Sequence, residues 1–201
     1  MPKGDSYAMT GVCILRIREG KIFPRIAVIV AAVALIVALA GAHGYCGDGI
    51  RTAGDIGQIA LPAAAVISTL VLKDTEGFKQ FVKAFLLSTA TTQGLKLAVH
   101  ERRPTGNADD SFPSGHTTSA FGGAGFLQMR YGWSIGLPAY VAAGFVGYSR
   151  VESKAHHVHD VLAGAAIGIG ANLIFVTPYQ NVSITPMTGR GLIGIQASMV
   201  W

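Results

Sequence analysis

The stretch "SFPSGHTTSAF", residues 111–121, places a proline, a serine, a glycine and a histidine at the start of an apolar segment. The chain around it has 201 residues, of which 50% are hydrophobic and only 13% are charged. Soluble domains usually contain about 25% charged residues. Because the apolar residues also form long blocks, the sequence predicts an all-α integral membrane protein, folded as one helical bundle. His116 is then expected near a membrane surface.

Six segments are predicted to cross the membrane, since a spanning helix needs roughly 20 mainly apolar residues. They cover residues 23–42, 55–73, 78–99, 116–132, 133–149 and 159–179, and the fourth and fifth are short. We expect residues 1–201 to form a single membrane-embedded domain with a cytoplasmic leader at 1–22, core motifs within 96–160 and a tail of unassigned role at 180–201. Small residues at 122–125, Gly164 and Gly168 suit close helix packing, although glycine is common in membrane helices anyway.

Basic residues near the ends of these segments indicate the orientation. The N-terminal flank and the turns near residues 73–83 and 130 are rich in lysine and arginine. A cytoplasmic N-terminus puts all of them on the cytoplasmic side and leaves the connections near 100–115 and 150–158 outside. The first segment also resembles a cleavable signal peptide because it ends in "ALAGA", but the charged leader before it is long for one.

The C-terminal tail carries a different pattern. From Ile193 onwards, apolar residues alternate with more polar ones, and this period of two predicts a strand. A single strand in the cytoplasm has no partner to pair with. The sequence gives no functional reason for it.

Three polar clusters fall on the outer side: "KLAVHERRP" (96–104), "PSGH" (113–116) and "SRVESKAHHVHD" (149–160). Lys96 and Arg103 are seven residues apart and share a face if their helix continues that far. His156 and Asp160 are four apart, so that the carboxylate can reach the imidazole on one helix face.

These residue types fit phosphate chemistry. Lys96, Arg103 and Arg150 together form a cationic pocket for a dianionic phosphate. Ser114 and Gly115, just before a predicted helix, add a hydroxyl and backbone N–H groups at a positive helix terminus.

Two histidines and a carboxylate supply the groups for a reaction. One of His116 and His156 can attack phosphorus as a neutral imidazole while the other gives a proton to the leaving oxygen. Asp160 can hold the tautomer of the attacking imidazole and stabilise its cationic form.

The pattern K-x6-RP, PSGH and SR-x5-H-x3-D resembles the type 2 phosphatidic acid phosphatase (PAP2) superfamily, which includes the vanadium haloperoxidases. The resemblance covers residues of about 78–179, and it implies a PAP2/haloperoxidase-like core in a six-helix membrane form. It implies that His156 is the nucleophile that forms a phosphohistidine, that His116 is the general acid, and that no metal or other cofactor is required. The phosphate ligands that it implies are Lys96, Arg103, Ser114, Gly115 and Arg150. Only eight residues separate Pro104 from Pro113, so any lid built from this loop is small and leaves the headgroup undetermined.

We therefore expect a metal-independent membrane phosphatase that hydrolyses a phosphomonoester or terminal phosphate of a lipid. Phosphatidic acid, phosphatidylglycerol phosphate, undecaprenyl pyrophosphate and lipid A phosphates are all open. Its expected place is a bacterial inner membrane, with the site facing the periplasm or the exterior. A lipid-to-lipid phosphotransferase and a non-catalytic lipid-phosphate-binding or transport protein are the alternatives. The net charge of +5 is carried by short flanks, which argues against nucleic-acid binding, and the sequence leaves the oligomeric state open.

Several polar residues near the clusters have simpler interpretations. His100, His157 and His159 are expected to be structural, and Asp109 and Asp110 to be solvated loop residues. "AHHVHD" also allows a metal site with ligands from His156, His157, His159 and Asp160. Adjacent histidines point in different directions on a helix, however, so that only a subset could share one ion.

Overall fold

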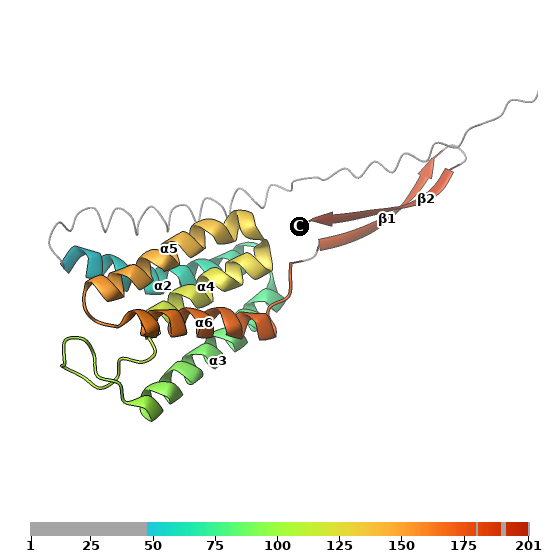
Figure 1. Ribbon diagram of the computed structural model, residues 1–201. Helices are drawn as coiled ribbons and strands as arrows, with labels where there is room; N and C mark the ends of the chain where they lie inside the picture. The colour runs from blue at the N-terminus through green and yellow to red at the C-terminus, as the bar shows by residue number, and fades with distance from the viewer. Residues whose placement is uncertain (1–47, 180, 190–191, 201) are drawn as a thin grey trace, which may run out of the picture. The chain divides into compact units, whose positions relative to one another are not determined.

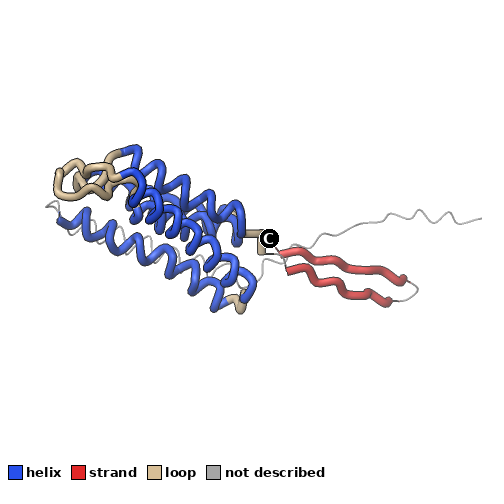
Figure 2. Tube along the Cα trace, turned by 90° about the horizontal axis from the view of Figure 1, so that it is seen from below, coloured by secondary structure: helices blue, strands red, loops and turns tan. Residues whose placement is uncertain are grey.

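The computed structural model describes residues 48–179, 181–189 and 192–200. Five helices lie side by side within these ranges (Figures 1 and 2). They are α2 (Asp48–Val71), α3 (Thr75–Val99), α4 (Gly115–Tyr131), α5 (Trp133–Glu152) and α6 (Val158–Phe175). Each overlaps one of the predicted apolar segments, which confirms the helical bundle. The first predicted segment, 23–42, lies outside the described residues.

Helix α4, which begins in the "PSGH" motif, lies at the centre of the bundle and contacts the other four described helices (Figure 1). Its side chains Ala120, Ala124, Phe126 and Leu127 are fully buried. Small residues let the neighbouring helices approach closely, while Phe126 fills the space between them with an edge-on contact to Phe81 of α3. The motif is thereby fixed to the most buried element of the bundle.

Two glycines of α6 are required by this close packing. A Cβ atom on Gly164 would lie 2.6 Å from the carbonyl oxygen of Ser114, and one on Gly168 would lie 2.5 Å from that of Thr118. Both distances are too short for any side chain, so α6 can pack on α4 only with glycine here. The packing interpretation of these two residues is confirmed.

The outer surface of the bundle is apolar. Leu97, Val141 and Leu173 are each more than 65% exposed, whereas Asn172 is buried and donates hydrogen bonds to the carbonyl oxygens of Gly122 and Gly168. Large exposed apolar side chains suit a hydrocarbon environment better than water. Within the described residues, two helices are long and apolar enough to cross a membrane, Gly49–Val71 and Val158–Phe175. The count of six spans stays a prediction.

A buried ion pair closes the end of the bundle where α2 joins α3. Asp74 begins α3 by accepting a hydrogen bond from the backbone N–H of Gly77, and Arg130 of α4 donates to both of its carboxylate oxygens at 2.6 and 2.7 Å. Burial raises the pKa of Asp74, but these hydrogen bonds lower it by more, and the result lies below the ordinary value. Arg130, which the charge pattern places in a cytoplasmic turn, is therefore also a structural residue.

The tail forms a hairpin. Strands β1 (Asn181–Gly189) and β2 (Leu192–Val200) pair antiparallel, with Asn181 opposite Val200 and Gly189 opposite Leu192. The strand predicted from Ile193 onwards is confirmed, but the expectation that it has no partner is wrong, because the preceding residues form a second strand. The hairpin belongs to a different compact unit from the helices and is an addition to the all-α class.

Three helix boundaries differ from expectation and shape the site. Helix α2 includes residues 48–54, which precede the apolar segment predicted at 55–73. Helix α3 ends at Val99, because His100 takes a left-handed conformation with φ of 49°. The shared helix face of Lys96 and Arg103 required the helix to continue to Arg103. It does not, and Arg103 lies in the loop after α3. Helix α6 begins only at Val158, so that His156 lies in the loop before it.

Candidate active site

The three polar clusters come together at one end of the bundle. The α3–α4 connection, the α5–α6 connection and the first turns of α2 and α4 all lie at the left end in Figure 1. Two groups of charged side chains form there, one around Asp110 and one around Asp55.

In the first group, Asp110 pairs with two of the cations predicted to bind phosphate, Arg103 and Lys96. Arg103 donates two parallel hydrogen bonds to the Asp110 carboxylate, at 2.8 and 3.0 Å. Lys96 donates to the backbone carbonyl of Asp110, and its Nζ lies 3.9 Å from the carboxylate. The hydrogen bond from Arg103 lowers the pKa of Asp110, which is therefore ionised at neutral pH. Asp110 is a loop residue with a 49% exposed side chain, as expected, but its pairing with Arg103 was not predicted.

His156 lies beside this group, only 4% exposed. Its Nδ1 is 3.5 Å from Oδ2 of Asp160, longer than a typical hydrogen bond, and has no hydrogen-bond partner among the described residues. Burial, followed by the positive charges of Lys96 and Arg103, lowers the pKa of His156 to about 4. The imidazole is consequently neutral at pH 7, which is the form that can act as a nucleophile.

Asp160, in the first turn of α6, is fully buried. Its Oδ2 accepts hydrogen bonds from the Ser111 hydroxyl at 2.5 Å and from the backbone N–H of His157 at 2.8 Å. These two donors fix the carboxylate toward His156. Ser111 was not singled out from the sequence, and only its place next to the "PSGH" motif hints at a role.

In the second group, Asp55 of α2 bridges two predicted site residues. Its Oδ1 lies 2.7 Å from Nη1 of Arg150 and 3.0 Å from Nε2 of His116. Arg150 is buried and also donates to the carbonyl oxygen of Arg51 at 2.6 Å. Sequence reasoning missed Asp55, although a carboxylate at the start of an apolar segment is a signal of function.

The approach of α2 to α5 depends on a third close-packed glycine. A Cβ atom on Gly54 would lie 1.9 Å from Oγ of Ser149 and 2.3 Å from Nη2 of Arg150. Without a side chain at this position, the guanidinium group of Arg150 passes across α2 and reaches Asp55.

The start of α4 joins the two groups. The backbone N–H of Ser114 donates to the carbonyl oxygen of Asp160 at 3.0 Å, and the Ser114 hydroxyl accepts a hydrogen bond from Thr117 at 3.0 Å. Ser114 is the N-cap residue, so the N–H groups of the next residues, beginning with Gly115, have no acceptor within the helix. A helix N-terminus with such groups attracts anions.

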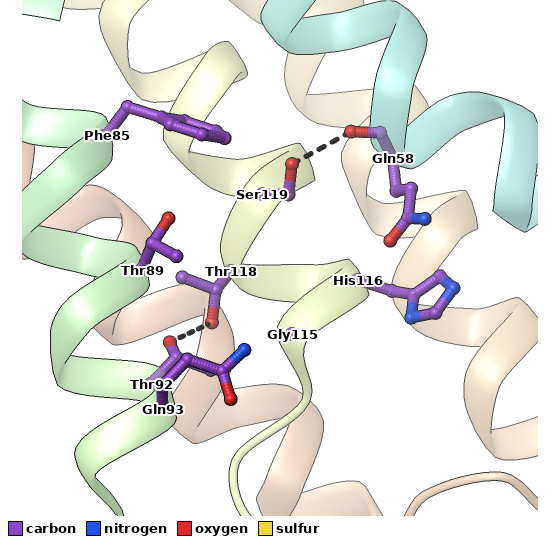
Figure 3. Close-up of a pocket in the computed structure, with 9 residues that line it drawn as sticks. All are labelled: Gln58, Phe85, Thr89, Thr92, Gln93, Gly115, His116, Thr118 and Ser119. Atoms are coloured by element: carbon purple, nitrogen blue, oxygen red, sulfur yellow. Dashed lines mark hydrogen bonds between the residues drawn. The ribbon is translucent and has the colours of Figure 1, made fainter. Parts of the chain in front are cut away.

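A pocket adjoins His116 between α2, α3 and α4 (Figure 3). Two hydrogen bonds hold its walls together, from Ser119 to the carbonyl oxygen of Gln58 and from Thr92 to Thr118. The side chains of this pocket come from Gln58, Phe85, Thr89, Thr92, Gln93, His116, Thr118 and Ser119, with Gly115 beside them. A second pocket shares some of these residues and continues along mainly apolar ones: Gln58, Ile59, Pro62, Ala63, Val66, Ile67, Phe81, Phe85 and Ser119.

The chain is similar to several known proteins. A model of the PAP2 superfamily matches residues 63–183. A lipid A 4'-phosphatase of Helicobacter pylori is 30% identical over 146 residues, which cover 66% of this chain and 74% of that protein. A lipid A 1-phosphatase of Porphyromonas gingivalis is 44% identical over 71 residues, which cover 33% of this chain and 16% of that protein. The crystal structure of Aquifex aeolicus LpxE matches with a TM-score of 0.51 and 25% identity, over 75% of this chain and 85% of the other.

Proposed function

The chain belongs to the PAP2 superfamily, and we propose that it is a membrane phosphatase that removes a phosphate group from a lipid. The observation that carries this proposal is the convergence of two imidazoles and three cationic side chains at one end of an apolar bundle. Two of the similar proteins are lipid A phosphatases, so a lipid A phosphate is the first substrate to test. Phosphatidic acid, phosphatidylglycerol phosphate and undecaprenyl pyrophosphate are the substrates to test after it.

Phosphate binding would replace the carboxylates that hold the cations in the free protein. A phosphate oxygen can accept the paired hydrogen bonds that Arg103 now gives to Asp110. Another can take the place of Asp55 beside Arg150. The N–H groups at the start of α4 add donors from the backbone.

The reaction then proceeds in two displacements. The Nε2 atom of His156 attacks phosphorus, the bond from phosphorus to the lipid oxygen breaks, and His116 gives a proton to that oxygen as it leaves. Water then attacks the phosphohistidine while His116 takes its proton, and His156 is released as a neutral imidazole. Asp160 stabilises the positive charge on His156 while the phosphoryl group is attached.

The second, mainly apolar pocket favours a lipid substrate. It continues from the pocket beside His116 and offers Ile59, Val66 and Phe81 as a surface for an acyl chain. A substrate that already lies in the bilayer would reach such a site along the apolar exterior of the bundle.

The membrane arrangement is part of the proposal. Six spans from a cytoplasmic N-terminus put both site connections on the periplasmic or outer side of a bacterial inner membrane. The exposed apolar side chains of α3, α5 and α6 support a bilayer environment. Labelling of a cysteine at the exposed position of Thr105, in a variant whose native Cys13 and Cys46 are replaced by serine, by a membrane-impermeant reagent would test the outward orientation.

The activity is tested by measuring phosphate release from a panel of phosphorylated lipids by detergent-purified protein in EDTA. We expect release that survives EDTA, because the proposed steps use only side chains of this chain. Loss of activity in EDTA would favour the metal-hydrolase interpretation. Phosphate found on an acceptor lipid would identify a phosphotransferase, and no turnover of any lipid by folded protein would contradict the proposal.

Asp110→Asn is expected to lower the KM for the lipid phosphate by about 3- to 5-fold, because an amide competes less well than a carboxylate for Arg103 and Lys96. This corresponds to the worth of a partly exposed ion pair, at most about 1 kcal/mol. The pKa of Asp110 lies below its ordinary value, so the wild-type carboxylate competes throughout the neutral pH range and the difference in KM should persist there.

Asp109→Asn is the matched control. The Asp109 carboxylate pairs with Arg102 at 3.6 Å, and both side chains are exposed, outside the site. An equal change in KM for both variants would mean that the loss of a negative charge near the entrance, and not the release of Arg103, is responsible.

A further inference from the structure

Four potential metal ligands meet beside the proposed active site. Glu101, from the α3–α4 connection, and His157, His159 and Asp160, at the start of α6, each bring one donor atom within 4.8 Å of all the others. Oε1 of Glu101 lies 2.7 Å from Nε2 of His159 and 3.3 Å from Nδ1 of His157. Oδ2 of Asp160 lies 3.4 Å from Nδ1 of His157, and Oδ1 of Asp160 lies 3.2 Å from Nε2 of His159. We refer to these residues as the Glu101–Asp160 cluster.

These distances fit a single small cation. Zn²⁺ binds imidazole nitrogen and carboxylate oxygen at about 2.0–2.1 Å in a tetrahedron, whose corners are then about 3.3 Å apart. The separations of 3.3 Å between Glu101 Oε1 and His157 Nδ1 and of 3.2 Å between Asp160 Oδ1 and His159 Nε2 are within 0.1 Å of that value. The hydrogen-bonded pair of Glu101 and His159 is closer, and the four donor atoms all lie within 4.8 Å of one another. Two imidazoles with two carboxylates are ligands for zinc and similar transition metals, because Ca²⁺ and Mg²⁺ prefer oxygen alone.

A second, independent observation points to a ligand. Asp160 is fully buried, and its Oδ1 has no hydrogen-bond partner within the part of the chain that the structure describes. The same holds for the buried Nδ1 of His157. Ser111 and the backbone of His157 satisfy only Oδ2 of Asp160, so Oδ1 remains directed at His159. Buried polar atoms without partners are rare and costly, and a cation would satisfy both.

A plain hydrogen-bond network explains the cluster less well. Glu101 and Asp160 bring two carboxylates together, and the imidazoles of His157 and His159 each lie within 3.4 Å of both. The rings of His157 and His159 stack in parallel with centroids 5.1 Å apart, and one nitrogen of each ring lies within 3.3 Å of Oε1 of Glu101. A divalent cation at the centre neutralises both carboxylates.

We propose that the Glu101–Asp160 cluster binds one Zn²⁺, or a similar divalent transition-metal ion, and that the bound ion inhibits the phosphatase. The ligand set differs from a catalytic metal site because it leaves out His156. The inhibition follows from Asp160, the carboxylate that faces His156 at 3.5 Å. Once its charge is shared with a cation, Asp160 stabilises the phosphorylated imidazole less well. Only this inhibitory step rests on the proposed function; the ion site does not.

Binding is tested by calorimetric titration of ZnCl₂ into tag-free, detergent-purified protein from which EDTA has been removed. We expect the wild type to bind one ion per chain. The Kd for Zn²⁺ should be about 10-fold higher or more in His159→Ala. His100→Asn is the control, because His100 is exposed outside the cluster and asparagine tolerates its left-handed backbone. Glu101→Gln, of nearly the same shape, provides a second weakened variant. Equal affinity in the wild type and both cluster variants, or no binding by the wild type, would overturn the site.

Inhibition is tested separately, by measuring lipid phosphate hydrolysis in buffered Zn²⁺ relative to the rate of the same variant in EDTA. We expect the wild type to be half-inhibited near the Zn²⁺ concentration that half-saturates it in calorimetry. In His159→Ala, the Zn²⁺ concentration that gives half-inhibition should be about 10-fold higher or more. Stoichiometric binding with an unchanged rate would overturn the coupling to Asp160. A wild type without activity in EDTA would contradict the proposed function, while calorimetry would still decide the ion site.

Discussion

The His156→Ala variant is expected to lose lipid phosphate hydrolysis by about 10⁴-fold or more and to form no phosphoenzyme, because the attacking atom is gone. The environment of His156 explains why no other group takes its place. It is a buried imidazole held neutral next to Lys96 and Arg103, and it faces the carboxylate that would stabilise its positive charge. The residual rate would come from phosphate binding and proton donation alone.

The measurement is incubation with lipid carrying radiolabelled phosphate, stopped with detergent at alkaline pH and followed by separation of the protein. A phosphohistidine keeps its label in alkali and loses it in acid, so brief exposure to each identifies the bond. Asp160→Asn retains the nucleophile and is expected to form the labelled protein more slowly, whereas His100→Asn should behave as the wild type. Near-normal turnover by His156→Ala would show that the nucleophile has been assigned wrongly.

The spacing of the motifs predicted which residues would meet, but not how they would meet. Lys96 and Arg103 do lie together, although α3 ends at Val99 and Arg103 reaches Lys96 through the loop and Asp110. A helical repeat describes only local geometry. A left-handed residue such as His100 ends the helix, and hydrogen bonds formed across the loop then decide where the next side chains lie.

Two residues of the site, Asp55 and Ser111, could not be predicted from the sequence, because their contacts depend on tertiary packing. Asp55 is 61 positions from His116 and 95 from Arg150, and their contacts arise only when α2 packs on α5 at Gly54. Ser111 is 49 positions from Asp160, and a serine in a polar loop has no distinctive pattern. By contrast, the helices themselves were predictable, because long apolar segments leave the backbone few ways to satisfy its hydrogen bonds.

The loss of His116 should depend on the substrate's leaving group. His116→Ala is expected to slow hydrolysis of an alkyl lipid phosphate by about 10²- to 10⁴-fold, the usual worth of a general acid. An alkoxide is too basic to leave without a proton. A nitrophenolate leaves without one. Hydrolysis of a nitrophenyl phosphate whose ring carries the same chain should therefore slow far less in His116→Ala. The ratio of the two values of kcat/KM, in the wild type and the variant, is the quantity to measure.

Asp55→Asn separates proton donation from placement of the ring. It keeps the imidazole but removes the negative charge that lies 3.0 Å from Nε2 of His116 and 2.7 Å from Arg150. If Asp55 only positions these groups, both substrates should slow by a similar factor, and the ratio of their kcat/KM values should stay near that of the wild type. The assignment would be contradicted if kcat/KM fell equally for both substrates in His116→Ala as well. His116 would then act on phosphate binding, and another group would have to give the proton to the leaving oxygen.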